Sequence, residues 1–404
     1  MDWSTPRHPE IDFARDALPN LALLMDELRE AGRFVPIRFH GQVACLITHY
    51  DDVKAAFLDE QTFPAAAAHR EHTEPVLGRT MTTMTGRDHR RNRALVSPAF
   101  RPAVLRAAMA PLLRPLADEL IDGFAGAGGG RGEAELMSQY TRPIAFRTIT
   151  RYMQIPVEDE PAVLDWASRL LHFAWDPEPA LDAARRIRRY LTGVVEARRK
   201  EPGDDLISEL TRAEFEDRQL DDPEVVTAIL ALFAAAIDGP ANVMGSLIAR
   251  VLETPELEAR TRNDPGIDAG LIEETLRMAP SPALMPRRCP KATRWRGVDL
   301  PEGASVVFGI TPANRDPAIF PDPARFDPDR KLDHSIMTFG QGVHLCLGNH
   351  LARLEMRAAL RALLERFPDL RLADEGPVDF VGGVIRGPRS LRVRWSDPGR
   401  GRPA

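Results

Sequence analysis

Cys346 and His344 stand in a ten-residue stretch, residues 339–348, that contains three glycines. Glycine adopts positive φ angles at little cost, so the backbone of this stretch can turn tightly around whatever the cysteine holds. Cys346 also precedes a segment whose apolar residues recur at helical spacing, and the partial positive charge at the start of a helix favours a thiolate over a thiol. A lone thiolate in such a loop is suited to ligate haem iron, although an isolated cysteine is more often a buried free thiol.

The order of residues in this stretch, Phe-Gly-Gln-Gly-Val-His-Leu-Cys-Leu-Gly, resembles the haem-binding loop of the cytochrome P450 family. Glu274 and Arg277 match the Glu-x-x-Arg helix of that family. Residues 313–328 are similar to its meander, and this resemblance makes Arg325 the third member of a structural Glu-Arg-Arg cluster behind the haem. The resemblance covers essentially the whole chain. It implies a mainly α fold with a minor β region, the helical triangular prism of the cytochrome P450 fold, and haem b held by Cys346 as axial ligand of the iron.

His89 and Arg93 lie four residues apart, which places both side chains on one face of a helix. Both can donate hydrogen bonds to a carboxylate, and arginine can do so through two N–H groups. On an arginine-rich helix such a pair is more often a solvated face. The resemblance instead implies that His89, Arg93, Arg287 and His344 hold the haem propionates, with Arg288 as the competing assignment for Arg287.

Composition limits the classes of partner and compartment. The chain has 404 residues and a net charge of −6, and no basic run is interleaved with aromatic residues, so no nucleic-acid partner is expected. The three cysteines, Cys45, Cys289 and Cys346, are odd in number and widely spaced, which disfavours a disulfide framework and fits a reducing cytoplasm. The first ten residues lack a signal-peptide core, and the longest apolar run, residues 228–237, is too short to cross a bilayer. We expect a cytoplasmic protein without a membrane association, similar to the soluble bacterial branch of the family.

At 404 residues the chain exceeds the usual size of a single hydrophobic core, so subdomains around one cofactor are reasonable, and the resemblance implies one domain spanning residues 1–404. A small β-rich subdomain is expected near residues 33–62 and 284–311, together with the C-terminal strands, and a helical subdomain elsewhere. Residues 63–84 show no clean period and are predicted to be an irregular loop, which by resemblance overlies the substrate. Residues 396–404 are predicted to form a disordered tail. The predicted helices cover residues 18–32, 51–58, 107–124, 163–174, 180–199 and 222–252. The predicted strands cover residues 34–39, 43–48, 298–301, 305–309 and 384–395.

The segment 222–252 contains the clearest departure from the family. Where the family writes Ala-Gly-x-Asp/Glu-Thr, this chain has Ala-Ala-Ile-Asp-Gly, ending at Gly239, and then Pro240. Asp238 keeps the acid, while Gly239 replaces the threonine that assists oxygen activation in the family. Proline has no N–H, so the carbonyl of Ala236 loses its helical partner, and we expect a kink that can hold water. Proton delivery would then rely on Asp238, water and the substrate itself.

The resemblance implies a haem-thiolate monooxygenase that inserts one oxygen atom from O2 into a small organic substrate, by hydroxylation or oxidative demethylation. Cys346 would donate electron density to the iron, and Asp238 would relay protons. No flavin or iron–sulfur domain is recognisable, so a separate ferredoxin and its NAD(P)H-dependent reductase are expected to supply electrons. Gly239 also supports an alternative, a haem-thiolate enzyme that uses peroxide or couples radicals. A non-catalytic haem or gas-binding protein is a second alternative, which the retained Asp238 disfavours.

Arg353, Arg357 and Arg361 are spaced four residues apart in the helix predicted after the cysteine, so they would form a basic stripe on one helical face. Arg90 and Arg91 would extend this stripe if the two helices meet behind the haem. Such a surface would attract an acidic ferredoxin. The alternative is an ordinary solvated face paired with neighbouring glutamates.

Overall fold

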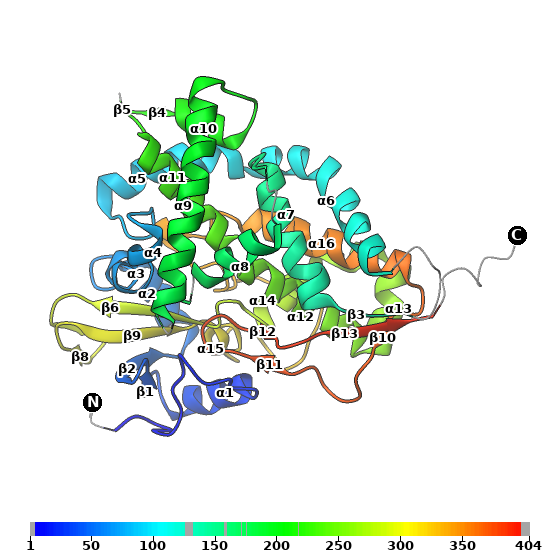
Figure 1. Cartoon of the computed structure of the whole chain (residues 1–404). Coiled ribbons are helices and arrows are strands. Elements are labelled where there is room, and N and C mark those ends of the chain that lie inside the picture. The colour runs from blue at the N-terminus through cyan, green and yellow to red at the C-terminus, as the bar shows by residue number, and fades with distance from the viewer. Residues whose placement is uncertain are drawn as a thin grey trace, which may run out of the picture.

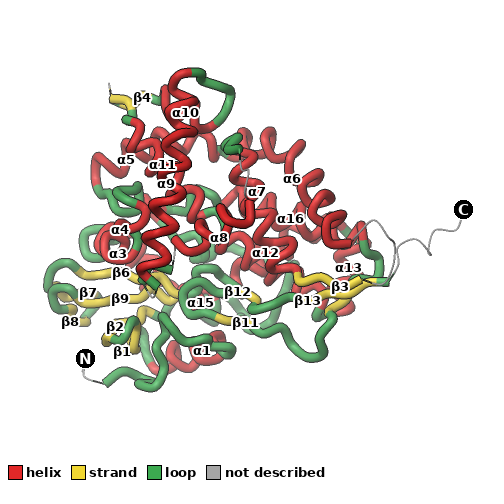
Figure 2. The backbone as a smooth tube through the Cα atoms, in the orientation of Figure 1, coloured by secondary structure: helices red, strands yellow, loops and turns green. Residues whose placement is uncertain are grey.

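The structure is a computed structural model that describes residues 5–125, 132–156, 160–170, 172–174, 176–216 and 218–396. Helices make up most of the molecule, and most strands lie along its lower side in the view of Figure 1, apart from a short pair within residues 214–219 near the top. Figure 2, coloured by secondary structure, shows the same arrangement, with most red helices above and most yellow strands below. The predicted fold class, mainly α with a minor β region, is confirmed.

The described helices and strands follow each other along the chain as predicted in most places. The α-helices are α1 (Leu21–Ala31), α2 (Tyr50–Leu58), α3 (Ala65–His72), α4 (Glu74–Leu77), α5 (Gly86–Val96), α6 (Pro102–Ala125), α7 (Arg142–Tyr152), α8 (Glu160–Leu170), α9 (Pro177–Lys200), α10 (Leu206–Arg212), α11 (Asp222–Ala235), α12 (Asp238–Leu252), α13 (Pro255–Asn263), α14 (Asp268–Met278), α15 (Ile310–Asn314) and α16 (Asn349–Arg366). The strands are β1 (Phe34–Phe39), β2 (Gln42–Ile47), β3 (Gly132–Glu135), β4 (Glu214–Phe215), β5 (Arg218–Gln219), β6 (Leu284–Cys289), β7 (Thr293–Trp295), β8 (Val298–Leu300), β9 (Ala304–Gly309), β10 (Arg371–Leu372), β11 (Phe380–Val381), β12 (Gly387–Pro388) and β13 (Arg392–Trp395).

The largest sheet joins two distant parts of the chain in the order β1-β2-β9-β6. β1 and β2 form an antiparallel hairpin whose two turn residues, His40 and Gly41, both have positive φ, the combination that a tight two-residue hairpin turn requires. β2 then pairs in parallel with β9, and β6 lies antiparallel to β9 with Arg287 opposite Val306. This register places Arg287 and its neighbours beside α3, which packs on β6.

Residues 63–84 are not an irregular loop throughout, so that prediction is wrong: α3 and α4 occupy much of the segment. α3 begins with four alanines, which have the strongest intrinsic helix propensity, and Ala65, Ala66 and Ala68 are buried. A helix of only eight residues whose buried face is made of alanine shows little hydrophobic contrast. The sequence pattern therefore contains no clean period, although the helix forms.

The predicted central helix is divided into α11 and α12 by the non-helical residues Ala236 and Ile237. α11 starts with a capping box, in which Asp221 and Glu224 each accept the other's backbone N–H. The break lies just before Gly239-Pro240, where the missing N–H of Pro240 leaves the carbonyl of Ala236 without its helical donor. Nearly every residue of α12 is buried, among α7, α14 and α16.

By length and composition alone, residues Asp222–Leu252 are apolar enough to cross a membrane. This is weak evidence for a span, because half of the apolar window is buried inside the protein and the core helix of a compact protein passes the same test. Of the predicted tail, residues 397–404 lie outside the described residues. Ser396 is described, and its backbone N–H donates to the Asp369 carboxylate over 2.9 Å.

Candidate functional site

The loop that carries Cys346 is folded back on itself. The Cys346 N–H donates to the Phe339 carbonyl over 2.9 Å, and the Asn349 side chain donates to the Cys346 carbonyl over 2.7 Å. Gly340 and Gly342 have positive φ, and a Cβ at Gly340 would lie 3.3 Å from the Phe57 ring, so backbone conformation and close packing both demand glycine there. The third glycine of the motif, Gly348, has a negative φ and caps the start of α16.

Cys346 is accessible from the surface of the polypeptide yet closely surrounded by protein. This burial raises the pKa of the Cys346 thiol, while the N–H groups of Gly348 and Asn349 at the start of α16 and the positive charges of Arg93 and Arg353 act in the opposite direction. The expected effect of the helix start on the sulfur is therefore present. Burial has the larger effect, so the pKa of the thiol is raised on balance.

α5 brings His89 and Arg93 to this loop. Arg93 Nη2 donates to the Leu345 carbonyl over 2.6 Å, and the His89 and His344 rings are 4.2 Å apart between centroids. Burial, followed by the charges of His344 and Arg93, lowers the pKa of His89 to about 4. His89 Nε2 is buried without a hydrogen-bond partner among the described residues. A buried unpaired ring nitrogen is costly, so it marks a position where a ligand atom would be stabilised.

β6 supplies Arg287, whose side chain is buried between the rings of Phe57 and Phe308, with the guanidinium carbon 5.8 and 5.2 Å from the ring centroids. Burial lowers the pKa of Arg287 to about 10, against the opposing effect of Glu60. The competing assignment, Arg288, faces elsewhere: it donates to the Glu71 carboxylate and to the Gly303 carbonyl.

Four of the sequence-predicted residues thus converge from three separate segments: His89, Arg93, Arg287 and His344. The carboxylate next to them is Glu60, which sequence reasoning missed and which lies 3.4 Å from His344 Nε2. Hydrogen-bond donors therefore outnumber acceptors in this cluster, and such a cluster is suited to bind the carboxylates of a ligand. The residues fit a haem: its two propionates would meet these donors, and the sulfur of Cys346 would meet its iron.

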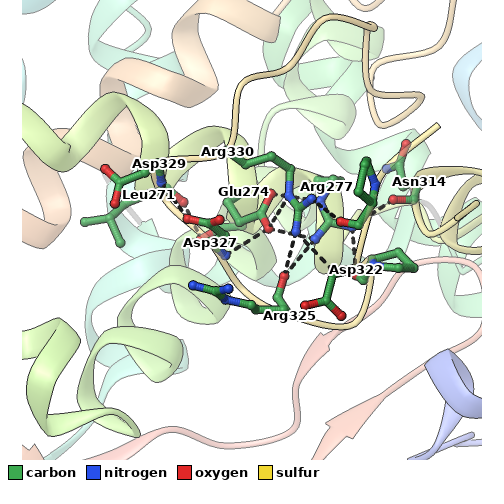
Figure 3. Close-up of polar contacts among 12 residues, drawn as sticks. Leu271, Glu274, Arg277, Asn314, Asp322, Arg325, Asp327, Asp329 and Arg330 are labelled. Carbon is green, nitrogen blue, oxygen red and sulfur yellow. Dashed lines mark hydrogen bonds and ion pairs between the residues drawn. The ribbon is translucent and has the colours of Figure 1, made fainter.

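The structural cluster behind the site is formed by Glu274, Arg277 and Arg330 (Figure 3). Arg277 Nε and Nη2 donate to the two Glu274 oxygens over 2.8 and 2.7 Å, and Arg330 Nε donates to Glu274 Oε1 over 3.0 Å. The prediction that Arg325 is the third member is wrong. Its side chain is exposed, and it contributes its backbone carbonyl, which accepts from both Arg277 and Arg330.

Asp238 occupies the first turn of α12, and its side chain is buried. Its Oδ1 lies 3.6 Å from Nε of Arg142 at the start of α7. Burial raises the pKa of Asp238, while Arg142 and His172 act to lower it. Gly239 is not forced by packing, since a Cβ there would be in ordinary contact, 3.7 Å from the Ser281 carbonyl.

The predicted basic stripe on α16 is mostly neutralised by α14. Arg353 donates to both oxygens of Glu273, and Arg361 donates to Asp268 and to the Thr261 carbonyl. These arginines are therefore paired with carboxylates of another helix, not with the glutamates of their own. The other side of α16 carries Glu355, a fully buried carboxyl whose Oε2 has no hydrogen-bond partner among the described residues.

Comparison with known proteins agrees with this geometry. The family model for "Cytochrome P450" matches residues 19–265 and 269–390. The chain is 34% identical to 6-deoxyerythronolide B hydroxylase of Saccharopolyspora erythraea, covering 92% of this chain and 93% of that protein. It is 31% identical to mycinamicin IV hydroxylase/epoxidase of Micromonospora griseorubida, covering 88% and 90%. Among solved structures, the cytochrome P450 PksS of the Bacillus subtilis bacillaene polyketide synthase superposes with a TM-score of 0.85 at 28% identity, covering 94% of this chain and 97% of that one. The chain belongs to the cytochrome P450 family, and is an oxidoreductase that uses haem b.

Proposed function

We propose that this cytochrome P450 hydroxylates or epoxidises a small organic substrate with O2 and that Cys346 is the axial ligand of its iron. His89, Arg93, Arg287 and His344 hold the propionates. The observation that carries this assignment is the convergence of these donors on the Cys346 loop, with His89 Nε2 buried and unpaired. When bound, the haem supplies the activation of dioxygen and the transfer of one oxygen atom to the substrate.

Asp238 provides the proton path in this proposal. Its carboxyl is buried, and burial raises its pKa, so it exchanges protons more readily near neutral pH than an exposed aspartate does. Arg142 lies 3.6 Å away and holds the carboxylate in place when it is charged. The free carbonyl of Ala236 at the break before α12 supplies an acceptor for a water that links Asp238 to the substrate.

Replacement of Asp238 by Asn tests this path. The amide keeps the shape of the carboxyl and cannot release a proton, so the O2-dependent rate should fall by roughly 10²–10⁴-fold. Peroxide-driven turnover, which brings its own oxygen and protons, should fall much less. Asp182→Asn, at a half-exposed aspartate of α9 paired with Arg186, is the control and should leave both rates unchanged. An Asp238→Asn variant with an unchanged O2-dependent rate would remove Asp238 from the mechanism.

The second candidate function is a peroxide-using or radical-coupling reaction on the same haem, and Gly239 in place of the usual threonine favours it. Steady-state dependence of turnover on O2, NAD(P)H and peroxide separates the two. Gly239→Thr is a further discriminator, because a Cβ at Gly239 would be in ordinary contact with the Ser281 carbonyl, 3.7 Å away. The restored hydroxyl should improve coupling of NAD(P)H to product if O2 is the oxidant, and should leave a peroxide enzyme unchanged.

We propose a ferredoxin and its NAD(P)H-dependent reductase as the electron source. Because Arg353 and Arg361 are paired with carboxylates, the docking charges are assigned to exposed arginines nearer the Cys346 loop, Arg90 on α5 and Arg106 on α6. Exposed Val343 and Leu345 on the loop itself provide an apolar centre. Charge steering acts mainly on association rate and is screened over about 8 Å at physiological ionic strength.

Reduction by ferredoxin should therefore slow with added salt, while reduction of the same protein by dithionite should not. Arg90→Glu and Arg106→Glu should raise the half-saturating ferredoxin concentration. Arg185→Glu, an exposed charge on α9, serves as the control and should have no effect. A ferredoxin-dependent rate that ignores both salt and the two reversals would place the docking surface elsewhere.

We propose the cytoplasm as the location, because the three cysteines are all free, two of them buried. The absorption spectrum of the haem can be used to identify the substrate. A screen of organic compounds against the ferric protein should begin with 6-deoxyerythronolide B and mycinamicin IV, the compounds named for the two relatives. A compound that shifts the spectrum and is then oxidised with O2 identifies the substrate class.

A further inference from the structure

α3 is tied to the donor cluster at its first residue. The Ala65 N–H lies 3.4 Å from Glu60 Oε2, and the same oxygen lies 3.4 Å from His344 Nε2. α3 also packs on β6, the strand that carries Arg287, and Figure 1 shows the helix lying above this edge of the sheet. The helix that the sequence suggested only as an irregular cover is therefore part of the wall of the site.

His69 lies one helical turn after Ala65, so both residues share the face of α3 that is turned toward the cluster. His69 is half-buried. Its burial, and then the nearby charges of Arg287, His344 and His72, lower the pKa of His69 to about 3. The ring is therefore neutral near pH 7 and has one N–H to donate. The Thr73 hydroxyl donates to the His69 carbonyl over 2.9 Å, and its oxygen lies 3.5 Å from His69 Nδ1, too far for a strong hydrogen bond, so the ring proton is free to reside on Nε2 and to meet a ligand there.

His72, on the same short helix, has different surroundings. Its ring stacks on His40 of the β1–β2 turn, with centroids 5.2 Å apart and the planes 27° from parallel. It also borders a cavity of about 120 Å³ between that turn, α3 and β6. His72 thus connects α3 to the β1–β2 hairpin, while His69 lies on the face of α3 toward the donor cluster that contains Arg287 and His344. The two histidines make a matched pair for experiment.

We propose that His69 is an additional positioning residue for the cofactor, donating a hydrogen bond from its ring to a haem propionate and so fastening α3 over the site. The bond joins a neutral donor to a charged acceptor, which is a stronger class of hydrogen bond than one between neutral groups. Because α3 belongs to the segment that overlies the substrate in the family resemblance, haem binding and the ordering of α3 are coupled through one side chain. The inference rests on the family's cofactor and not on the proposed oxidant, partner or substrate.

The test is the rate at which the haem-loaded protein loses haem to an excess of apomyoglobin. His69→Leu removes the donor at similar volume and should accelerate haem loss roughly tenfold, the factor that corresponds to about 1.4 kcal/mol. His69→Gln keeps an N–H at a similar distance from the backbone and should restore most of the parental rate. His72→Leu, on the same helix, should leave the rate unchanged. None of these readouts depends on catalytic turnover.

Hydrogen exchange of the peptides covering α3 provides the second measurement. In the parent and in His69→Gln, α3 should exchange more slowly with haem than without it, and in His69→Leu this difference should shrink. An unchanged rate of haem loss in His69→Leu overturns the proposal. Equal acceleration in His69→Leu and His72→Leu also overturns it, because the cause would then be the packing of α3. Failure of His69→Gln to slow haem loss below the rate of His69→Leu would exclude the hydrogen bond.

Discussion

Removal of the Arg330 guanidinium, by Arg330→Ala, should destabilise the protein far more than removal of the Arg325 side chain. Arg330 is about one-tenth exposed and donates to Glu274 Oε1 over 3.0 Å, to the Pro321 carbonyl over 2.6 Å and to the Asp322 and Arg325 carbonyls over 3.1 and 3.0 Å. When this guanidinium is removed, three backbone carbonyls and one carboxylate oxygen each lose one hydrogen-bond donor.

The size of the destabilisation in Arg330→Ala depends on the hydrogen bonds that Glu274 keeps. Breaking a buried ion pair by removing one partner costs about 3–5 kcal/mol, because the other charge stays buried. Here Glu274 keeps both bonds from Arg277 and the N–H of Asp327, so the lower end of that range applies, and we expect about 3 kcal/mol. Arg325 has an exposed side chain, and alanine there preserves the backbone carbonyl that the cluster uses. Arg325→Ala should change the free energy of unfolding by less than about 0.5 kcal/mol.

The assay is a denaturant titration of both variants and the parent at fixed temperature, followed by circular dichroism. A melting temperature is a less sensitive readout in a protein of 404 residues, since the unfolding entropy of about 0.8 kcal/mol/K converts 3 kcal/mol into only about 4 °C. Equal destabilisation by the two substitutions would refute the assignment of the third cluster member. A neutral Arg330→Ala would refute the energetic reasoning as well.

Two further predictions concern a buried carboxyl and the thiolate. Burial raises the pKa of Glu355 well above 4.5, so the native state keeps a proton that the unfolded chain releases. The free energy of unfolding should therefore fall as the pH rises above about 4.5, by up to about 1.4 kcal/mol per pH unit. The fall should end where the native carboxyl ionises. Glu355→Gln should abolish this slope, which is measured as the free energy of unfolding of parent and variant between pH 5 and pH 8; parallel pH profiles would contradict it. Cys346→Ser should lose the carbon monoxide absorption of the reduced protein that is diagnostic of thiolate ligation, together with all activity, whereas Cys45→Ser and Cys289→Ser should keep both; a retained thiolate spectrum in Cys346→Ser would exclude the ligand assignment.

The parts of the site that lie in short contiguous motifs could be predicted from the sequence. The Cys346 loop is one example, because tight turning and close contact with Phe57 restrict its glycines locally. His89 and Arg93 are another, because helical spacing alone puts them on one face. In each motif the local backbone geometry alone brings the residues together, so their proximity can be predicted without knowledge of the fold.

Groups whose role depends on long-range packing were missed or misassigned. Arg325 and Arg330 both follow the Glu-x-x-Arg helix by about fifty residues, in a loop without a repeating period. Only the path of that loop decides which guanidinium turns inward to Glu274. Glu60 and His69 were missed for the same reason, since the turn after α2 and helix α3 meet the Cys346 loop only in the folded chain.

The arginines of α16 show that helical spacing predicts which residues share a face but not whether their charges are exposed. Four-residue spacing correctly puts Arg353, Arg357 and Arg361 on one face, but it does not say whether that face meets water or another helix. Here it meets α14, which presents Glu273 and Asp268 to it. Arg357, half exposed and 3.9 Å from Asp268, keeps the most freedom of the three. A paired charge contributes little field at a distance, because the opposite charge beside it cancels most of it. If a ferredoxin is the electron donor, as proposed, its recognition would therefore depend on the exposed arginines of α5 and α6, Arg90 and Arg106.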